Sequence, residues 1–346
     1  MNHTRILKRA WEILWSYRTL WVFGILLALT AGGGGNGSGF NSSYKGERDG
    51  STFSLPPEMM RDLRALGRAM QGWFSGIDVG AFIGLGVALL CLILLLMILG
   101  KVVNYVSQVA LMRMVDGLEA RGEKVSWREG FRLGWSRAAW RLFLLDLLVY
   151  LPLVVVFIGL FGCALLPVII SAAARGEPSG AAVFGTVVLI LPLILLAVII
   201  GATVSLVMNL ARRQCVLGDK GVVESLRLGV ALLRRRFADL VVIWLILIGV
   251  MIGYSILLIP LVFLLMGVGA LVGAGVGVAV YFLLRGLAAS TSAILTAIFF
   301  GLTPFIVILA VPLVFLEGLR QTYYSTAWTL AYREASDAAP AVVAQA

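Results

Sequence analysis

The chain has very little histidine, cysteine or charge, and these shortages exclude most catalytic chemistry. Its single histidine is His3, and its three cysteines form no C-x-x-C pair and no plausible disulfide framework. Zinc sites and serine–histidine relays both draw on histidine. We therefore expect no catalytic residue, no metal ligand set and no cofactor-binding residue, and we expect that the protein is not an enzyme.

Charged residues make up only 13% of the chain, whereas 60% of its residues are hydrophobic. Residues 79–99 and 181–210 contain no charge at all. About 20 apolar residues suffice to cross a bilayer as a helix, and the backbone must satisfy its own hydrogen bonds there. The sequence predicts an all-α polytopic membrane protein, a single transmembrane domain over residues 1–335 with a flexible tail at 336–346. Six spans are expected near residues 19–35, 79–100, 142–173, 181–210, 240–265 and 287–316.

The count of six depends on one region. Residues 240–284 carry no charge, so they could form two spans, which would give seven in all. The alternative is one span followed by a glycine-rich outer segment at 266–284, which would be re-entrant in the bilayer. We favour six spans.

Basic residues indicate the orientation. With these six spans, 21 of the 28 Lys and Arg fall on the side of the N-terminus. Cytoplasmic segments carry such an excess, so we expect both termini in the cytoplasm of a bacterial inner membrane. The net charge of +10 then indicates contact with anionic lipid headgroups and not with nucleic acid.

The predicted first outer segment, residues 32–78, is glycine-rich and then helical. Gly32, Gly34 and Gly37 match G-x-G-x-x-G, but a nucleotide site needs a strand before this motif and a helix after it. We interpret them as a loop. The following residues alternate apolar and basic faces at helical spacing, which predicts an amphipathic helix that lies in the membrane interface or faces a partner. Its apolar side includes Met59, Leu63 and Trp73.

A repeat marks the cytoplasmic side. "SWREGFRLGW" and "VVESLRLGVALLRRRF" share E-x-x-R-L-G at an offset of 95 residues, and Ser126 with Glu129 forms a capping box. Together with "LKRAWEILW", they predict three helical-hairpin pseudo-repeats, each opened by a cytoplasmic amphipathic helix. We expect the following residues to face the membrane or a partner: Trp127, Phe131 and Trp135 in residues 126–143, and Leu226, Val230 and Leu233 in residues 222–237.

Polar residues near the spans support a second interpretation. Asp146, Asp239 and Arg285 lie close to span ends, where a carboxylate would pair with a neighbour such as Arg141 or Arg236. In a transporter, however, polar side chains would line a cavity, and prolines would break the spans. The candidates for such a cavity, besides these three charged residues, are Asn209, Tyr254, Ser255 and Thr303.

The two repeated segments and the terminal "STAWTLAYRE" resemble a group of uncharacterised bacterial six-span proteins. These are similar to the membrane domain of some glycerophosphoryl diester phosphodiesterases. The resemblance implies a membrane domain without catalytic residues, because the histidine and acidic residues of the phosphodiesterase domain have no counterpart here.

The sequence therefore favours a non-catalytic membrane protein that organises lipid or a partner subunit, possibly as a homo-oligomer. The alternative is a transporter or permease for a small molecule or lipid.

Overall fold

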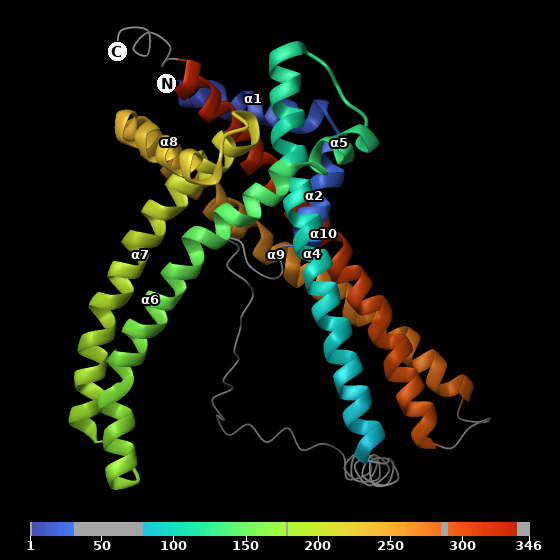
Figure 1. The fold of residues 1–346 in the computed structure, drawn as a ribbon. Helices are drawn as coiled ribbons and strands as arrows, with labels where there is room; N and C mark the ends of the chain where they lie inside the picture. Colours follow the sequence, from blue (N-terminus) through green and yellow to red (C-terminus); the bar gives the residue numbers. More distant parts are fainter. Residues whose placement is uncertain (1, 31–78, 178, 285–289, 338–346) are drawn as a thin grey trace. The chain divides into compact units, whose positions relative to one another are not determined.

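The fold is entirely helical over the residues that the computed structural model describes, which are 2–30, 79–177, 179–284 and 290–337 (Figure 1). The all-α class is thus confirmed for these residues. Their helices, in chain order, are α1 (His3–Ser16), α2 (Thr19–Thr30), α4 (Val79–Arg121), α5 (Trp127–Gly134), α6 (Arg137–Arg175), α7 (Gly180–Leu217), α8 (Val222–Arg235), α9 (Phe237–Leu284) and α10 (Ser290–Asp337).

Long apolar helices dominate this order. In the described residues, α4, α6, α7, α9 and α10 are each long and apolar enough to cross a membrane, and the bent pair α1–α2, with 99° between its helices, raises the count to six if it forms one span. The 39 residues of α6 extend roughly 58 Å at 1.5 Å per residue. A bilayer core is only about 30 Å thick. Each long helix therefore has a segment that extends beyond the hydrocarbon.

Three details of the described helices bear on the expectations and alternatives drawn from the sequence. Residues 266–284 continue α9 without a break. The prolines do not break the long helices, and α10 runs through Pro304 and Pro312. Residues 126–143 are not one helix, because α5 ends at Gly134 and α6 begins at Arg137. Trp135 therefore lies in the break between two helices.

The chain divides into two compact units. Among the described residues, the first unit contains 2–27, 102–251 and 318–337, and the second contains 28–30, 79–101, 252–284 and 290–317. The first unit holds the short helices α1, α5 and α8, most of α2, the whole α6–α7 pair and one end of each of α4, α9 and α10. Helices α6 and α7 pack along each other within it (Figure 1). The predicted outer segment 32–78 and tail residues 338–346 lie outside the described residues.

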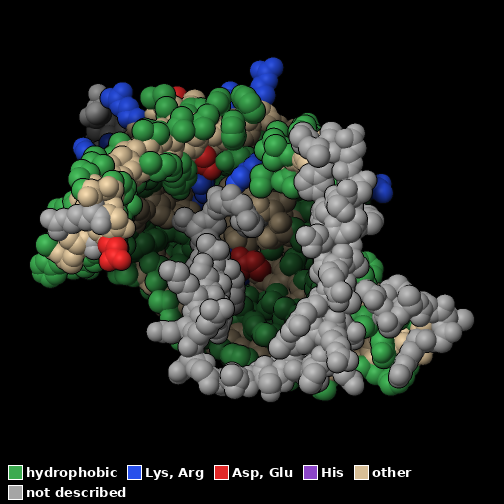
Figure 2. All heavy atoms as spheres, turned by 90° about the horizontal axis from the view of Figure 1, so that it is seen from below, with side chains coloured by type: hydrophobic (Ala, Val, Ile, Leu, Met, Phe, Trp, Pro, Cys, Tyr) green, Lys and Arg blue, Asp and Glu red, His purple; other side chains and the backbone are tan. Residues whose placement is uncertain are grey.

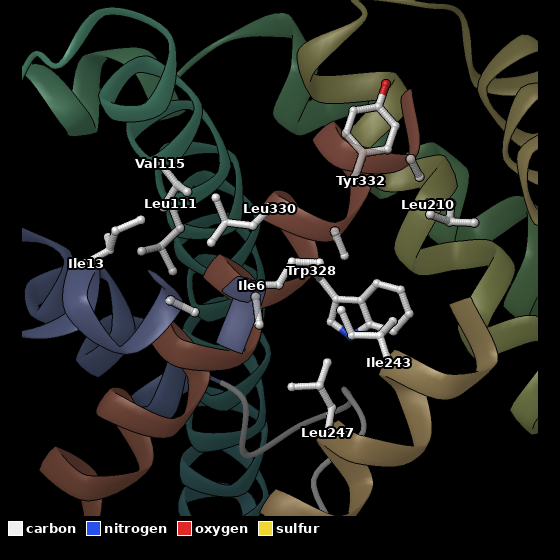
Figure 3. Close-up of a cluster of buried hydrophobic side chains, with 14 of the residues drawn as sticks. Ile6, Ile13, Leu111, Val115, Leu210, Ile243, Leu247, Trp328, Leu330 and Tyr332 are labelled. Atoms are coloured by element: carbon white, nitrogen blue, oxygen red, sulfur yellow. The ribbon is translucent and has the colours of Figure 1, made fainter. Parts of the chain in front are cut away.

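The first unit has a hydrophobic core (Figure 3). Ile13 of α1, Leu111 of α4, Leu210 of α7 and Ile243 of α9 are nearly or fully buried in it, and Trp328 of α10 has no exposed surface. Burying one such large side chain stabilises a fold by about 1.5–3 kcal/mol. The core therefore joins helices from the beginning, middle and end of the chain.

Glycines let helices approach within this unit. A Cβ atom at Gly134 of α5 would overlap the Val106 carbonyl oxygen of α4. A Cβ atom at Gly229 of α8 would lie 3.0 Å from the Ala211 nitrogen of α7. The two glycines of the E-x-x-R-L-G repeat thus make the same kind of contact, each against the C-terminal half of the preceding long helix.

Beyond the core, the surface of the long helices is apolar. In α6, Val155 and Ile158 are more than half exposed, as are Phe184 and Leu191 in α7. The space-filling view shows hydrophobic side chains over much of the described surface on that face, with few charged ones among them (Figure 2). Such a surface suits a hydrocarbon environment.

Candidate functional site

Two features of the first unit could carry a function: a set of buried polar contacts between helix ends and an exposed aromatic face at α5. The polar contacts centre on α7. Arg212 of α7 donates two hydrogen bonds to the carboxylate of Asp146 in α6, from Nε to Oδ1 and from Nη2 to Oδ2, both 3.0 Å long. The Tyr105 hydroxyl of α4 donates to Oδ2 at 3.2 Å. The carboxylate is thus held by two other helices.

This arrangement corrects one sequence prediction. Arg141 does not pair with Asp146 but with Asp219, at 2.7 Å. Residues five apart on a helix point to different sides of it, whereas neighbours on one face are three or four apart. The other predicted pair is confirmed, because Arg236 and Asp239 are three apart and lie 3.6 Å from each other.

Arg213, the next residue of α7, points into the core. Only 2% of its surface is exposed, and no carboxylate of the described chain lies within ion-pair distance of it. Its Nη1 donates to the Asn209 carbonyl at 2.6 Å, and its Nη2 donates to the Ser325 carbonyl of α10 at 3.1 Å. The guanidinium carbon also lies 5.9 Å from the centre of the Trp328 ring. Arg213 therefore joins the ends of α7 and α10.

Asn209 belongs to this network and not to an open cavity. Its side chain is mostly buried and donates to the Ser205 carbonyl at 2.9 Å. The other cavity candidates, Tyr254, Ser255 and Thr303, belong to the second unit. The Thr303 hydroxyl donates to the Phe299 carbonyl of its own helix at 2.8 Å. Arg285 lies outside the described residues.

A third contact joins α10 to α4. Arg333 donates to the Asp116 carboxylate at 2.6 Å and to the Asp116 carbonyl at 3.0 Å. The end of α4 is thus linked to α10, α10 to α7, and α7 through Asp146 to α6. Such partly buried ion pairs are weak evidence for stability by themselves, because the cost of desolvation opposes the Coulombic gain.

The aromatic face lies on α5. Trp127, Phe131 and Trp135 are 54%, 37% and 64% exposed. The rings of Phe131 and Trp135 stack with 6.0 Å between centroids. Trp140, also 64% exposed, adds a large ring in the first turn of α6. We call Trp127, Phe131 and Trp135 the α5 aromatic face.

The residues of α8 that were predicted to face a membrane or partner are less exposed than those of α5. Leu233 is buried in the core of the first unit, and Leu226 packs against the cluster formed by Leu145, Met208 and Ala211. The prediction that it faces a membrane or partner is therefore wrong for Leu233, because the chain's own helices cover it, whereas for the partly buried Leu226 it stays a prediction. Val230 is half-buried. Met59, Leu63 and Trp73 lie outside the described residues.

Sequence reasoning missed the roles of Arg212, Arg213 and Tyr105. Adjacent arginines at the end of a span read as the positive-inside signal, and nothing local shows that one turns towards α6 and the other into the core. A metal centre finds no support in the described residues, which contain no group of three or more potential His, Cys, Asp or Glu ligands.

Together, the long apolar helices and these contacts define a helical membrane protein, with five candidate spans among the described residues and up to six if the bent pair is one span. The chain matches the family of unknown function DUF7544 over residues 7–331, and it therefore belongs to that family. No curated protein and no solved structure matches it. None of these comparisons links the chain to glycerophosphoryl diester phosphodiesterases.

Proposed function

We propose that this protein is a non-catalytic multi-pass membrane protein that organises lipid or a partner subunit through its first unit. One observation carries the proposal: several buried or partly buried polar groups of the first unit hold helices together, while the large aromatic side chains of α5 face outwards. Asp146, Arg212 and Arg213 are engaged with other helices. The α5 aromatic face has no such internal role, since it is largely exposed.

The proposal includes three pseudo-repeats with both termini on the cytoplasmic side. The order of helices supports it, because each of α1, α5 and α8 precedes two further helices. The contacts of Gly134 with α4 and of Gly229 with α7 support it as well. Helix α1 would occupy the equivalent place on α10, which Trp11 approaches through Tyr323 at 6.3 Å between ring centroids.

Native mass spectrometry of the full chain, extracted gently from its own membrane, tests the proposal. A second polypeptide at fixed stoichiometry, a second copy of the chain or a defined number of retained lipids is the expected result. A chain that carries neither polypeptide nor lipid under conditions that preserve its fold would contradict the proposal.

A transporter is the second candidate, and the contact of α9 with α10 in the second unit favours it. A Cβ atom at Gly273 of α9 would lie 2.6 Å from the Gly301 carbonyl oxygen, and one at Gly277 would lie 3.1 Å from the Ala297 carbonyl oxygen. Close helix contacts at small residues are common in membrane helix pairs, although both helices run unbroken through Pro260 and Pro304.

Single cysteines at Ser255 and Thr303, in a chain whose three native cysteines are replaced by alanine, test this candidate. Reaction of both with a membrane-impermeant thiol reagent, together with flux of a solute into vesicles, would establish a water-filled path. If neither cysteine reacts with the reagent, the transporter proposal is contradicted.

A further inference from the structure

Helix α5 is held in place by its neighbours and not by its own stability. It has eight residues, and isolated helices shorter than about 12 residues are marginal in water. Gly134 sits against the Val106 carbonyl of α4. At the other end of α5, the Tyr17 hydroxyl donates to the Val125 carbonyl and accepts from the Val125 amide, both at 2.6 Å. The helix is therefore clamped at both ends.

Arg113 of α4 completes this clamp. Its Nη1 donates to the Leu133 carbonyl at 3.0 Å and to the Ser136 hydroxyl at 3.2 Å. A cation at this place also suits the partial negative charge at the end of a helix. The glycines of α5 lie on its buried side. The clamp therefore fixes which side of α5 is exposed, and that side is the α5 aromatic face.

The position of α5 in the chain places that face at a membrane boundary. Helix α6, a candidate span, begins at Arg137, and only Trp135 and Ser136 separate the two helices. Trp and Tyr gather where a membrane meets water, because the ring is apolar and its polar group remains wet. Two exposed tryptophans next to the first turn of a candidate span are therefore expected to lie in the membrane interface and not in bulk water.

Basic side chains flank the same face. The Arg128 guanidinium carbon lies 5.2 Å from the centre of the Trp127 ring. The Arg132 side chain is 81% exposed and 3.8 Å from Glu129. Residues 121–141 contain six Lys or Arg against two Glu. The charge that complements this surface is negative, and in a leaflet the phosphates of anionic phospholipids carry it.

We propose that α5 is a binding site for anionic phospholipids, in which the α5 aromatic face enters the headgroup layer and Arg128 and Arg132 contact the phosphates. This proposal rests on the proposed function and names its lipid. The site selects lipid by charge, because the aromatic side chains enter any headgroup layer while the two arginines favour a negative one.

The test uses the full chain in vesicles of phosphatidylglycerol and phosphatidylcholine in equal amounts, with identical acyl chains. After mild extraction, native mass spectrometry gives the ratio of the two lipids retained per chain. The variant Arg128→Gln with Arg132→Gln should lower the ratio of phosphatidylglycerol to phosphatidylcholine by roughly fivefold for each arginine removed. Both side chains are exposed, so the fold should survive, and an unchanged unfolding temperature would verify it.

Arg234→Gln with Arg235→Gln in α8 is the matched control. It removes the same charge from two exposed arginines at the end of another short helix, away from the exposed tryptophans of α5. The ratio should stay within about twofold of the parent chain. An equal fall in both variants would show general attraction to basic residues and overturn the site. An unchanged ratio in the α5 variant would overturn it too.

A further arm separates this proposal from the proposed function. If extraction from native membrane shows a second polypeptide that the α5 variant loses, while its lipid ratio stays unchanged, the face is a protein contact. The lipid site would then be wrong and the organising role would stand. Solute flux unaffected by the α5 variant, with no lipid or polypeptide retained, would count against both.

Discussion

A single methyl group at Gly24 should separate α2 from α10. A Cβ atom at this position would overlap the Thr322 hydroxyl and the Gly318 carbonyl oxygen, and one at Gly318 would lie 2.8 Å from the Ile25 nitrogen. Most of these neighbours are backbone atoms of helices, which cannot rotate away as a flexible side chain does. Gly24→Ala must therefore move one helix against the other within the first unit.

The size of the effect follows from two opposing contributions. Overpacking of this kind costs about 1–3 kcal/mol, while alanine is favoured over glycine within a helix by about 1 kcal/mol. Gly201→Ala in α7 is the matched control, because a Cβ atom there meets nothing within 4 Å. The Gly201→Ala variant should therefore gain the helix preference of alanine without any overpacking cost. Because both positions lie inside helices, the gain from alanine is common to both variants, and they should differ by the overpacking cost of about 1–3 kcal/mol, with Gly24→Ala the less stable.

Thermal unfolding in detergent, followed by tryptophan fluorescence, measures this difference. At roughly 2–4 °C per kcal/mol for a large domain, the two unfolding temperatures should lie roughly 2–12 °C apart. Gly318→Ala should lower the free energy of unfolding less in the Gly24→Ala variant than in the parent chain, because the first methyl group has already separated the helices. Equal stability of the Gly24→Ala and Gly201→Ala variants, or full additivity of the pair, would refute the close crossing.

Three further substitutions probe contacts of the first unit, each measured by thermal or denaturant unfolding. Asp146→Asn weakens the grip of Arg212 and should cost about 2 kcal/mol; adding Arg212→Met should recover part of this loss, and no recovery would contradict the pairing. Trp328→Ala should cost about 3–5 kcal/mol, and a loss below 1 kcal/mol would place the ring outside the core. Tyr17→Phe removes both hydrogen bonds to Val125 and should cost about 1–3 kcal/mol, whereas an unchanged stability would show that water replaces them.

The membrane class and the approximate positions of the long helices could be predicted from the sequence. Charge-free runs such as 181–210 have few physical solutions in a bilayer, so composition alone determines that they are helices. The N-cap of α5 was also predictable from the capping-box pattern of Ser126 and Glu129. The structure confirms it, since the Ser126 hydroxyl accepts a hydrogen bond from the Glu129 amide at 3.4 Å. Local chemistry is sufficient for both features.

The contacts between distant segments could not be predicted. Phe131 and Leu226 occupy the same place in the two repeated segments, yet Phe131 is exposed and Leu226 packs against the cluster of Leu145, Met208 and Ala211. Hydrophobic spacing shows that one side of a short helix is apolar, but it does not show what covers that side. In the same way, Arg212 and Arg213 are equivalent in the sequence, and only tertiary packing sends one to a carboxylate and the other into the core.

Arg213 offers a test of whether the buried polar network is structural. The Ser325 carbonyl that it contacts also accepts the Thr329 hydroxyl at 2.8 Å. Removing the guanidinium therefore leaves this acceptor satisfied, and it also removes the cost of burying a charge without a carboxylate partner.

Arg213→Met, which keeps most of the side-chain length, should accordingly leave the free energy of unfolding unchanged or raise it. Arg213→Ala should lower it by about 2 kcal/mol or more, because it opens a cavity against Trp328. Lipid and polypeptide retention of the methionine variant should equal that of the parent chain, since the proposed contact surface lies elsewhere, on α5. A methionine variant as unstable as the alanine variant would show that the two hydrogen bonds outweigh desolvation. A stable methionine variant that loses its bound lipid or polypeptide would move the functional site from the surface of α5 to the interior of the first unit.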